Sequence, residues 1–362
     1  MVTDSRIQRF AELLVDYCIE GSYHRRYVGV TGTTAAEPLI IAVYEKLLKT
    51  EAFPVLRISF PEQTSIFFSS ASDYHFTTLN KFELNYAKLV DAVIHIQSET
   101  NTRALSNISP VKQATYIRTN ASITRMFLNK KWVLTLFPTS GYAQEAEMSL
   151  SEFEDFVYNA MYLDEKNPVN AWRRIGREQK ALIRKIEGVH EVRILSDDTD
   201  LRFSITGRRF ISSDGHTNMP TGEIYVAPVE NSVEGHIFFD ISAGYRGTLV
   251  SGVKLCFKKG EVVEAYAEKN ESLLHTILDI DEGARRIGEF GIGTNLRIDR
   301  FIHNILFDEK VYGTIHLALG RSVHNSGGKN NSTIHWDMIK DMRKGGLILF
   351  DGKVFQRDGR FK

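Results

Sequence analysis

Short apolar runs alternate with longer stretches of helical spacing in the first half of the chain. The apolar runs, which are typical of strands, are 27–31, 55–60, 92–98 and 132–138. Between them lie stretches with helical periodicity, among them 35–49 and a segment that begins at Pro110. Strands that alternate with helices in this way indicate a parallel sheet covered by helices. The alternation therefore predicts an α/β N-terminal domain with a mostly parallel sheet.

The pattern changes near Gly188, after two further helical stretches at 149–163 and 170–188. From Val192 onward the apolar runs are shorter and β-like, and turn-forming sequences such as SDDTD, SSDG, KKGE and FDGK separate them. One helical stretch, 271–288, interrupts this second half. We therefore predict two domains, 1–188 and 189–362, of which the second is α+β and mainly antiparallel.

The composition argues against several classes of function. Of 362 residues, 43% are hydrophobic and 25% charged, and 45 Lys and Arg balance 45 Asp and Glu, so no net charge favours nucleic acid or an anionic membrane. No apolar run approaches the ~20 residues of a membrane span, and the acidic N-terminal segment is unlike a signal peptide. Cys18 and Cys256 lie far apart in apolar patterns, which argues against a disulfide framework. We expect a cytoplasmic protein.

The sequence VTGTTAAEPL, which follows the first predicted strand, combines a glycine with a helix start. Such a turn exposes backbone N–H groups that can hold a phosphate. It lacks the glycines of GxGxxG and has no Walker lysine. We therefore interpret it as a strand-to-helix turn in which Thr33 or Thr34 caps the helix.

Four segments of the second half place polar side chains where packing alone does not explain them. They are NMPTGEIYVAP with Glu223, RRIGEFGIGTN with Glu289, VYGTIHLALG with His316, and NSTIHWDMI with His335 and Asp337. The glycines around Glu289 would let another segment or a ligand approach closely. In an extended NSTIHWDMI segment, His335 and Asp337 would share one face and their apolar neighbours the other.

Taken singly, these five residues have ordinary structural interpretations. Glu223 and Glu289 would be solvated glutamates near turns. His316 would be a hydrogen-bonded core histidine, and His335 would pair with Asp337. Together, two histidines and three carboxylates match the ligands of hydrolytic metals, and burying them without a cation would be costly. Five ligands exceed the three that one catalytic zinc commonly takes, so the pattern favours two ions, a bridging carboxylate, and amide or ester hydrolysis.

The segments NMPTGE, IGEFGIGTN, GTIHLALG and STIHWD, in that order, resemble the thermophilic metallo-aminopeptidases of the aminopeptidase T type. The resemblance is specific over about residues 190 to 345 and looser in the first half. It implies two divalent ions, zinc or cobalt, with manganese also suited to such ligands. It further implies a cytoplasmic homodimer that acts on peptides with a free N-terminus. The implied metal ligands are Glu223, Glu289, His316, His335 and Asp337, with Glu289 as the bridge.

One position departs from the family pattern. Soon after the HLALG strand the family usually has a tyrosine, whereas this chain has Val323 in the sequence GRSVHNSGG. A phenol that could bind a developing oxyanion is therefore missing there. His324 is the next residue, but a shift of one position along a strand would turn its side chain to the opposite face. The departure leaves metal binding as expected and puts the peptidase rate or the class of substrate in question.

The leading hypothesis is a metal-dependent aminopeptidase in which two metals activate a water for attack on the first peptide bond. Two alternatives stay open: a metal-dependent hydrolase of another amide or ester, and a non-catalytic metalloprotein whose ions hold the second domain together. The sequence assigns no general base, because a base is identified by geometry first. As candidates for the general base, Glu230 and Glu234 cannot be distinguished from ordinary surface glutamates. His236 could support a metal ligand, although a structural role is the more common interpretation.

Overall fold

The computed structural model describes residues 4–21, 24–245 and 247–362, and the chain forms two compact units. Unit 1 comprises Met1–Trp172 and Gly215–Pro220, and unit 2 comprises Arg173–Asp214 and Thr221–Lys362. The boundary expected after residue 188 stays a prediction; the chain first passes from unit 1 to unit 2 at residue 172. None of the described helices combines the length and the apolar character needed to cross a membrane.

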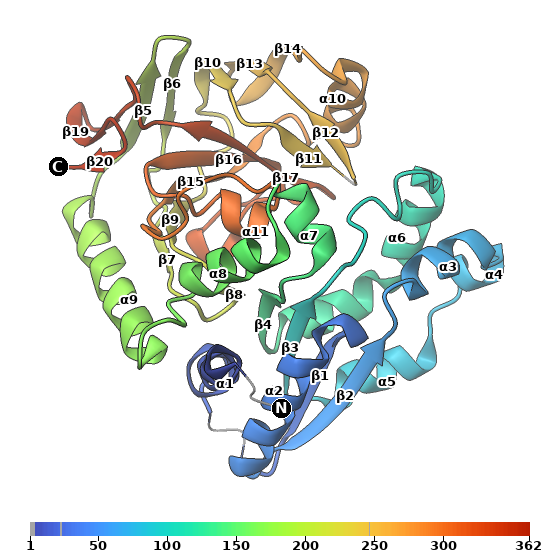
Figure 1. Ribbon diagram of the computed structural model, residues 1–362. Coiled ribbons are helices and arrows are strands. Elements are labelled where there is room, and N and C mark those ends of the chain that lie inside the picture. Colours follow the sequence, from blue (N-terminus) through green and yellow to red (C-terminus); the bar gives the residue numbers. More distant parts are fainter. Residues whose placement is uncertain (1–3, 22–23, 246) are drawn as a thin grey trace. The chain divides into compact units, whose positions relative to one another are not determined.

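Unit 1 is built on a five-stranded parallel sheet with the order β2-β1-β3-β4-β8 (Figure 1). Its strands are β1 (Tyr27–Thr33), β2 (Phe53–Ser59), β3 (Ala92–Gln97), β4 (Lys131–Leu136) and β8 (Asn218–Met219). Its helices are α1 (Ser5–Glu12), a π-helix (Leu13–Cys18), a 3-10 turn (Thr34–Ala36), α2 (Glu37–Lys49), α3 (Gln63–Ser70), α4 (Asp73–Thr77), α5 (Lys81–Leu89), α6 (Pro110–Leu128), α7 (Ser140–Glu145) and α8 (Leu150–Ala160). The predicted α/β domain with a parallel sheet is confirmed.

Local sequence accounts for the ends of these elements. The N-terminal helical segment buries Phe10, Leu14 and Cys18 completely, because helical spacing brings them to one face. At the end of β1, the Thr33 hydroxyl accepts a hydrogen bond from the Ala35 backbone N–H and so caps the first helical turn. The interpretation of the Gly-Thr sequence as a strand-to-helix turn is confirmed.

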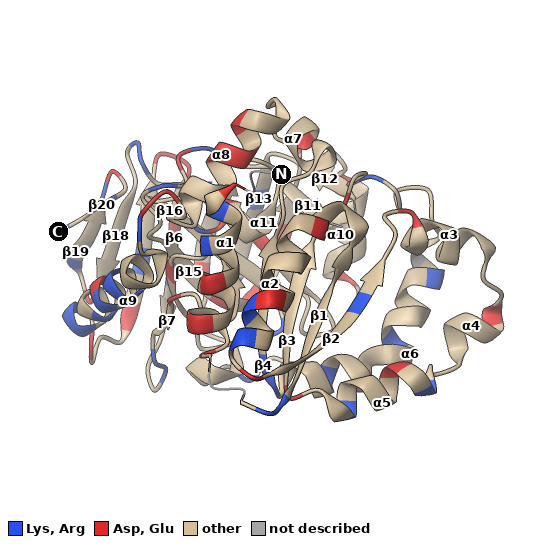
Figure 2. Cartoon of the chain, turned by 60° about the horizontal axis from the view of Figure 1, so that its bottom comes forward, with Lys and Arg blue, Asp and Glu red and all other residues tan. Residues whose placement is uncertain are grey.

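Helix α9 (Pro168–Lys185) is amphipathic. Its Lys and Arg residues are drawn in blue in Figure 2, and those at 173, 177, 180 and 184 are exposed. Ile175 and Gln179, four residues apart, are buried on the other side. The Gln179 side chain donates a hydrogen bond to the Ser213 carbonyl at 3.1 Å, so its amide is not left without a partner.

Unit 2 contains two large antiparallel sheets and a small one, and this confirms the predicted α+β, mainly antiparallel second half. Their orders are β14-β13-β10-β6-β5-β18-β19-β20, β17-β16-β15-β9-β7 and β11-β12. The strands are β5 (Glu191–Ser196), β6 (Thr199–Ser204), β7 (Ile211–Ser213), β9 (Glu223–Val226), β10 (Glu234–Phe239), β11 (Ala243–Tyr245), β12 (Thr248–Val250), β13 (Val253–Lys258), β14 (Glu261–Tyr266), β15 (Ile287–Gly293), β16 (Thr314–Gly320), β17 (His335–Asp341), β18 (Leu347–Phe350), β19 (Lys353–Arg357) and β20 (Arg360–Phe361). The short helices are α10 (Glu271–Leu278), α11 (Ile305–Asp308) and a 3-10 turn (His324–Ser326).

The helix expected over 271–288 is shorter than predicted. Helix α10 ends at Leu278, and β15 already begins at Ile287. Between them the Asp281 carboxylate accepts a hydrogen bond from the backbone N–H of Gly283 at 3.0 Å. This local turn competes with helix, as aspartate side chains commonly do.

One hydrophobic core joins the two large sheets of unit 2. Phe203 on β6 meets Phe290 on β15 in an edge contact, with ring centroids 5.3 Å apart. Leu317 and Met338, from β16 and β17, are buried in the same core. Because side chains alternate along a strand, the residues that flank these apolar ones point to the opposite face of the five-stranded sheet.

Candidate metal centre

The four polar segments fold into four neighbouring strands of the five-stranded sheet. Glu223 stands on β9, Glu289 on β15, His316 on β16, and His335 and Asp337 on β17. Their apolar neighbours in sequence, such as Phe290 and Trp336, are buried in the core on the other face. The structure therefore brings all five predicted residues together, and it confirms that His335 and Asp337 belong to one extended segment.

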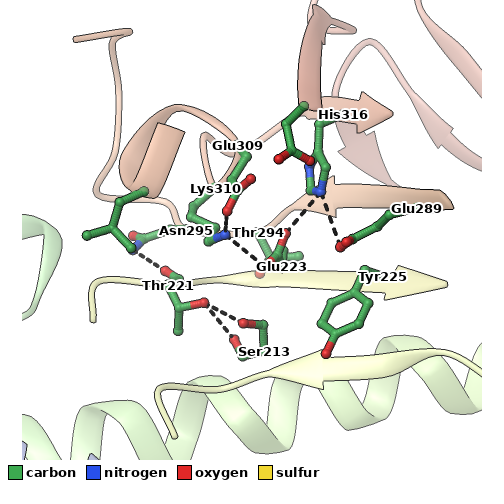
Figure 3. Close-up of polar contacts among 12 residues, drawn as sticks. Ser213, Thr221, Glu223, Tyr225, Glu289, Thr294, Asn295, Glu309, Lys310 and His316 are labelled. Atoms are coloured by element: carbon green, nitrogen blue, oxygen red, sulfur yellow. Dashed lines mark hydrogen bonds and ion pairs between the residues drawn. The ribbon is translucent and has the colours of Figure 1, made fainter. Parts of the chain in front are cut away.

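Glu289 belongs to two groups of polar side chains, and Figure 3 shows the one that it forms with His316 and Glu223. Its Oε1 lies 3.6 Å from His316 Nε2, which is itself 3.3 Å from Glu223 Oε2. Its Oε2 lies 3.4 Å from His335 Nε2, which is 3.5 Å from Asp337 Oδ2. Each group offers three atoms that lie within 4.8 Å of one another, and Glu289 belongs to both groups.

The N···O separations of 3.3 to 3.6 Å fit the edges of a metal site better than hydrogen bonds. An N–H···O hydrogen bond usually spans about 2.7–3.2 Å. Around a tetrahedral ion with bonds of ~2.0–2.2 Å, neighbouring ligand atoms are roughly 3.3–3.6 Å apart. Glu223 Oε2 and Asp337 Oδ1 are buried and have no hydrogen-bond partner among the described residues. The donor set therefore fits a divalent cation.

Protons on the histidines balance the carboxylates when no cation is bound. Burial opposes a charged His335, but Asp337 and Glu289 outweigh it and raise the His335 pKa to about 10. Burial likewise opposes a charged His316, yet Glu289 and the other nearby carboxylates raise the His316 pKa. The Asp337 pKa is lowered, because the pull of His335 exceeds the effect of burial. A divalent cation would take the place of these protons.

Two backbone contacts aim the imidazole rings. His335 Nδ1 lies 2.8 Å from the Arg321 carbonyl, so Nδ1 carries a hydrogen and Nε2 is the nitrogen that faces the carboxylates and would bind a cation in place of its proton. The ring of His316 lies over Gly291, where a Cβ atom would stand only 2.0 Å from His316 Cε1. A side chain at Gly291 would displace the ring. The predicted use of glycine for close approach is confirmed here.

A model of the thermophilic metalloprotease family (M29) matches residues 3–361. The chain belongs to this family. M29 is a metallopeptidase family, so the chain is a peptide hydrolase by class. The family resemblance inferred from the four segments is confirmed.

Named relatives of this M29 chain are aminopeptidases. Aminopeptidase T of Thermus thermophilus is 27% identical over 283 residues, which cover 67% of this chain and 68% of that protein. Aminopeptidase AmpS of Bacillus subtilis is 28% identical over 257 residues, which cover 61% of this chain and 60% of that protein.

Two solved structures share the M29 chain's fold. AmpT from Thermus thermophilus superimposes with a TM-score of 0.85 at 22% identity, covering 98% of both chains. A 2,5-dihydroxypyridine dioxygenase from Pseudomonas putida KT2440 gives a TM-score of 0.56 at 13% identity, covering 99% of this chain and 96% of that one. Because a protein named as a dioxygenase has a related fold, fold alone does not establish the chemistry of the M29 site, which follows from its residues.

The structure adds two charged residues to the M29 site that the sequence did not indicate. Lys310 has no exposed surface, and its Nζ lies 2.8 Å from Glu223 Oε1 and also contacts Glu309 (Figure 3). Glu309 in turn forms a third group of possible ligands with His316 and Asp337. A consecutive Glu and Lys after a short helix is typical of a solvated surface. The local sequence therefore did not indicate that either residue belongs to the metal centre.

The loop that follows β16 carries the departure from the family pattern. The Val323 N–H donates to the Gly288 carbonyl at 3.4 Å, which places residue 323 beside the residue that precedes Glu289. His324 Nδ1 lies 3.0 Å from the Gly328 carbonyl, so this ring is held within its own loop. A phenol reaches the same loop from β9, where the Tyr225 oxygen accepts a hydrogen bond from Asn325 Nδ2 at 2.9 Å.

Three further polar residues considered from the sequence are engaged outside the cluster. Glu230 pairs with Arg208 at 2.6 Å, and Glu234 accepts a hydrogen bond from the Lys259 backbone N–H at 2.9 Å. His236 stands on β10 of the eight-stranded sheet, opposite Asp200 on β6 and Cys256 on β13. It is absent from the three groups of possible metal ligands among the described residues, and its structural role stays a prediction.

Proposed function

We propose that this chain is a metal-dependent aminopeptidase that releases N-terminal residues from peptides with a free N-terminus. Membership of M29 supports a metallopeptidase, and the names of the relatives support an aminopeptidase. The observation that carries the proposal is the position of Glu289, whose two oxygens face two separate groups of nitrogen and oxygen atoms. That arrangement suits a carboxylate shared by two ions.

We assign five protein ligands to two divalent ions. Glu223 and His316 would hold one ion, His335 and Asp337 the other, and Glu289 would bridge them. Their separations support this assignment, as does the burial of Glu223, Glu289 and His316. Imidazole and carboxylate ligands suit zinc, cobalt and manganese. By analogy with the family resemblance, we also propose a cytoplasmic homodimer.

Two divalent ions held together supply a water of lowered pKa and polarise the carbonyl of the scissile bond. The residues of this chain do the positioning. The Arg321 carbonyl keeps the hydrogen of His335 on Nδ1, and Gly291 gives His316 room to reach its place. Three protein ligands in each group leave coordination positions open, as a catalytic site requires.

A second candidate function is hydrolysis of another amide or an ester. The observation that favours it is Val323, since a peptide oxyanion would lack the phenol expected beside Glu289. A substrate with a better leaving group needs less stabilisation of its oxyanion, and such a substrate would be cleaved even without that phenol.

The test is hydrolysis of leucine p-nitroanilide by protein stripped with a chelator and then supplied with zinc, cobalt or manganese in turn. The N-acetylated substrate serves as the matched control, because it differs only in the free amine. Activity that returns with metal and is lost on acetylation supports an aminopeptidase. Equal rates on both substrates would favour the second candidate. The absence of activity with every metal would refute the aminopeptidase and point to another substrate or a structural role for the metals.

A further inference from the structure

Neither the five-ligand assignment nor hydrolysis requires Lys310, which lies in the described cluster. Its side chain is completely buried. Burying an ammonium group costs several kcal/mol unless opposite charges surround it. Both carboxylates that contact Nζ, Glu223 and Glu309, belong to groups of possible metal ligands. The cost of burying Lys310 is thus offset within the metal centre itself.

A second buried lysine of the same unit shows the contrast. Lys340 on β17 is 2% exposed, and its Nζ donates to Asp198 Oδ1 at 2.9 Å and to the Phe238 carbonyl at 3.0 Å. Neither partner belongs to a group of possible metal ligands. Lys340 therefore joins strands, whereas Lys310 acts on a carboxylate of the site.

The ion pair between Lys310 and Glu223 gives the two carboxylate oxygens of Glu223 different partners. Lys310 Nζ lies 2.8 Å from Oε1, whereas Oε2 is buried, has no hydrogen-bond partner among the described residues, and faces His316 Nε2 at 3.3 Å. A carboxylate can otherwise bind a cation through both oxygens. With Oε1 held by an ammonium group, Glu223 has only Oε2 to offer.

We propose that Lys310 is a positioning residue that restricts Glu223 to a single ligating oxygen, Oε2, and thereby keeps a coordination position open for substrate or water. This inference rests on the proposed metal-dependent function. Lys310 also offsets one negative charge among four carboxylates, Glu223, Glu289, Glu309 and Asp337, and so weakens the hold of the site on a divalent ion. Lys310 thus lowers the affinity of the site for a metal ion and keeps a coordination position of that ion accessible.

Removing the ammonium group should therefore tighten metal binding and slow turnover. In Lys310→Met, both Glu223 oxygens become available and the site gains one negative charge. We expect zinc to bind at least about tenfold more tightly, because a nearby like charge has been removed from the cation. We expect kcat to fall at least about tenfold with little change in KM, because the lost position serves the reaction itself.

The experiment compares the wild type with Lys310→Met, Lys310→Gln and Lys340→Met. Zinc affinity is measured by competition with a chromophoric chelator, and the visible spectrum of the cobalt-loaded proteins reports coordination number. Lys310→Gln removes the charge but retains an N–H donor for Glu223 Oε1, so it should bind zinc more tightly and keep the wild-type cobalt spectrum. Lys310→Met should show the weaker absorption of a more highly coordinated cobalt.

Lys340→Met is the control for loss of a buried lysine, and it should lower thermal stability without changing zinc affinity or the cobalt spectrum. Weaker zinc binding in both Lys310 variants, or a wild-type cobalt spectrum in Lys310→Met, would overturn the inference. If Lys310→Met does not fold, the zinc affinity of Lys310→Gln tests the inference: tighter binding than in the wild type supports it, and weaker binding overturns it. Failure of the proposed function is a separate result, because it appears in the wild type as the absence of metal-dependent hydrolysis, whatever the zinc affinities of the Lys310 variants.

Discussion

Gly291 controls the position of His316, and replacing it with alanine tests whether that position matters. The two residues are register partners on β15 and β16. A Cβ at residue 291 would lie 2.0 Å from His316 Cε1 and 2.2 Å from Nε2, whereas ordinary contacts begin at 3.4 Å. The imidazole ring would have to retreat by about 1.4 Å, the difference between 3.4 and 2.0 Å.

A displacement of that size exceeds the tolerance of a metal site, in which ligand distances vary by about 0.2 Å. Disturbing residues that only support metal ligands already costs 10–100-fold in affinity, so displacement of a ligand should cost about 100-fold or more. Overpacking of a buried site also lowers the free energy of unfolding, by about 1–3 kcal/mol. A 100-fold loss of metal affinity corresponds to about 2.7 kcal/mol, so it should equal or exceed the loss of stability in most of this range.

Zinc titration and thermal unfolding of Gly291→Ala measure the two effects separately. Gly244→Ala is the matched control, because among the described residues a Cβ there meets only Leu249 Cδ2, at 3.8 Å. The control should retain wild-type zinc affinity and change stability by less than about 0.5 kcal/mol. Wild-type zinc affinity in Gly291→Ala would refute the placement of His316 in the metal centre.

Two further predictions concern the surroundings of the site. Burial raises the pKa of Asp308 from 3.8 to about 7 against hydrogen bonds such as that from the Ile302 N–H. Between about pH 4 and 7 the folded state therefore holds a proton on Asp308 that the unfolded state has lost. The free energy of unfolding should fall as pH rises through this range, by up to about 4 kcal/mol. Chemical unfolding of Asp308→Asn should show a weaker dependence on pH. Val323→Tyr should raise the kcat for leucine p-nitroanilide if the missing phenol limits the rate; an unchanged kcat would show that residue 323 does not serve this role.

The metal-centre residues could be predicted because each one interrupts an apolar strand pattern. His316 is the only histidine, acidic or basic residue in VYGTIHLALG, and His335 and Asp337 alternate with buried Ile334, Trp336 and Met338. Strand alternation then determines which face they share. The alternation of strands and helices likewise indicated the parallel sheet of unit 1.

Features that depend on contacts between distant segments could not be predicted in the same way. Strand β8 has only two residues, Asn218 and Met219, and exists because β4 pairs with it, so it has no periodicity to detect. Lys310 is buried because its segment packs against β15, where a Cβ on Gly293 would stand 2.0 Å from the Val311 carbonyl. The glycine was visible in the sequence, but the identity of its neighbour was not.

The role of Glu289 is the central claim, and a count of bound zinc tests it most directly. After loading and dialysis, elemental analysis of the wild type and of Glu264→Ala, which lacks an exposed carboxylate of the same unit, should give two zinc ions per chain. Glu289→Ala leaves only two assigned protein ligands in each group and should retain no stoichiometric zinc. Two zinc ions per chain in Glu289→Ala would contradict the shared carboxylate and the two-ion centre built on it.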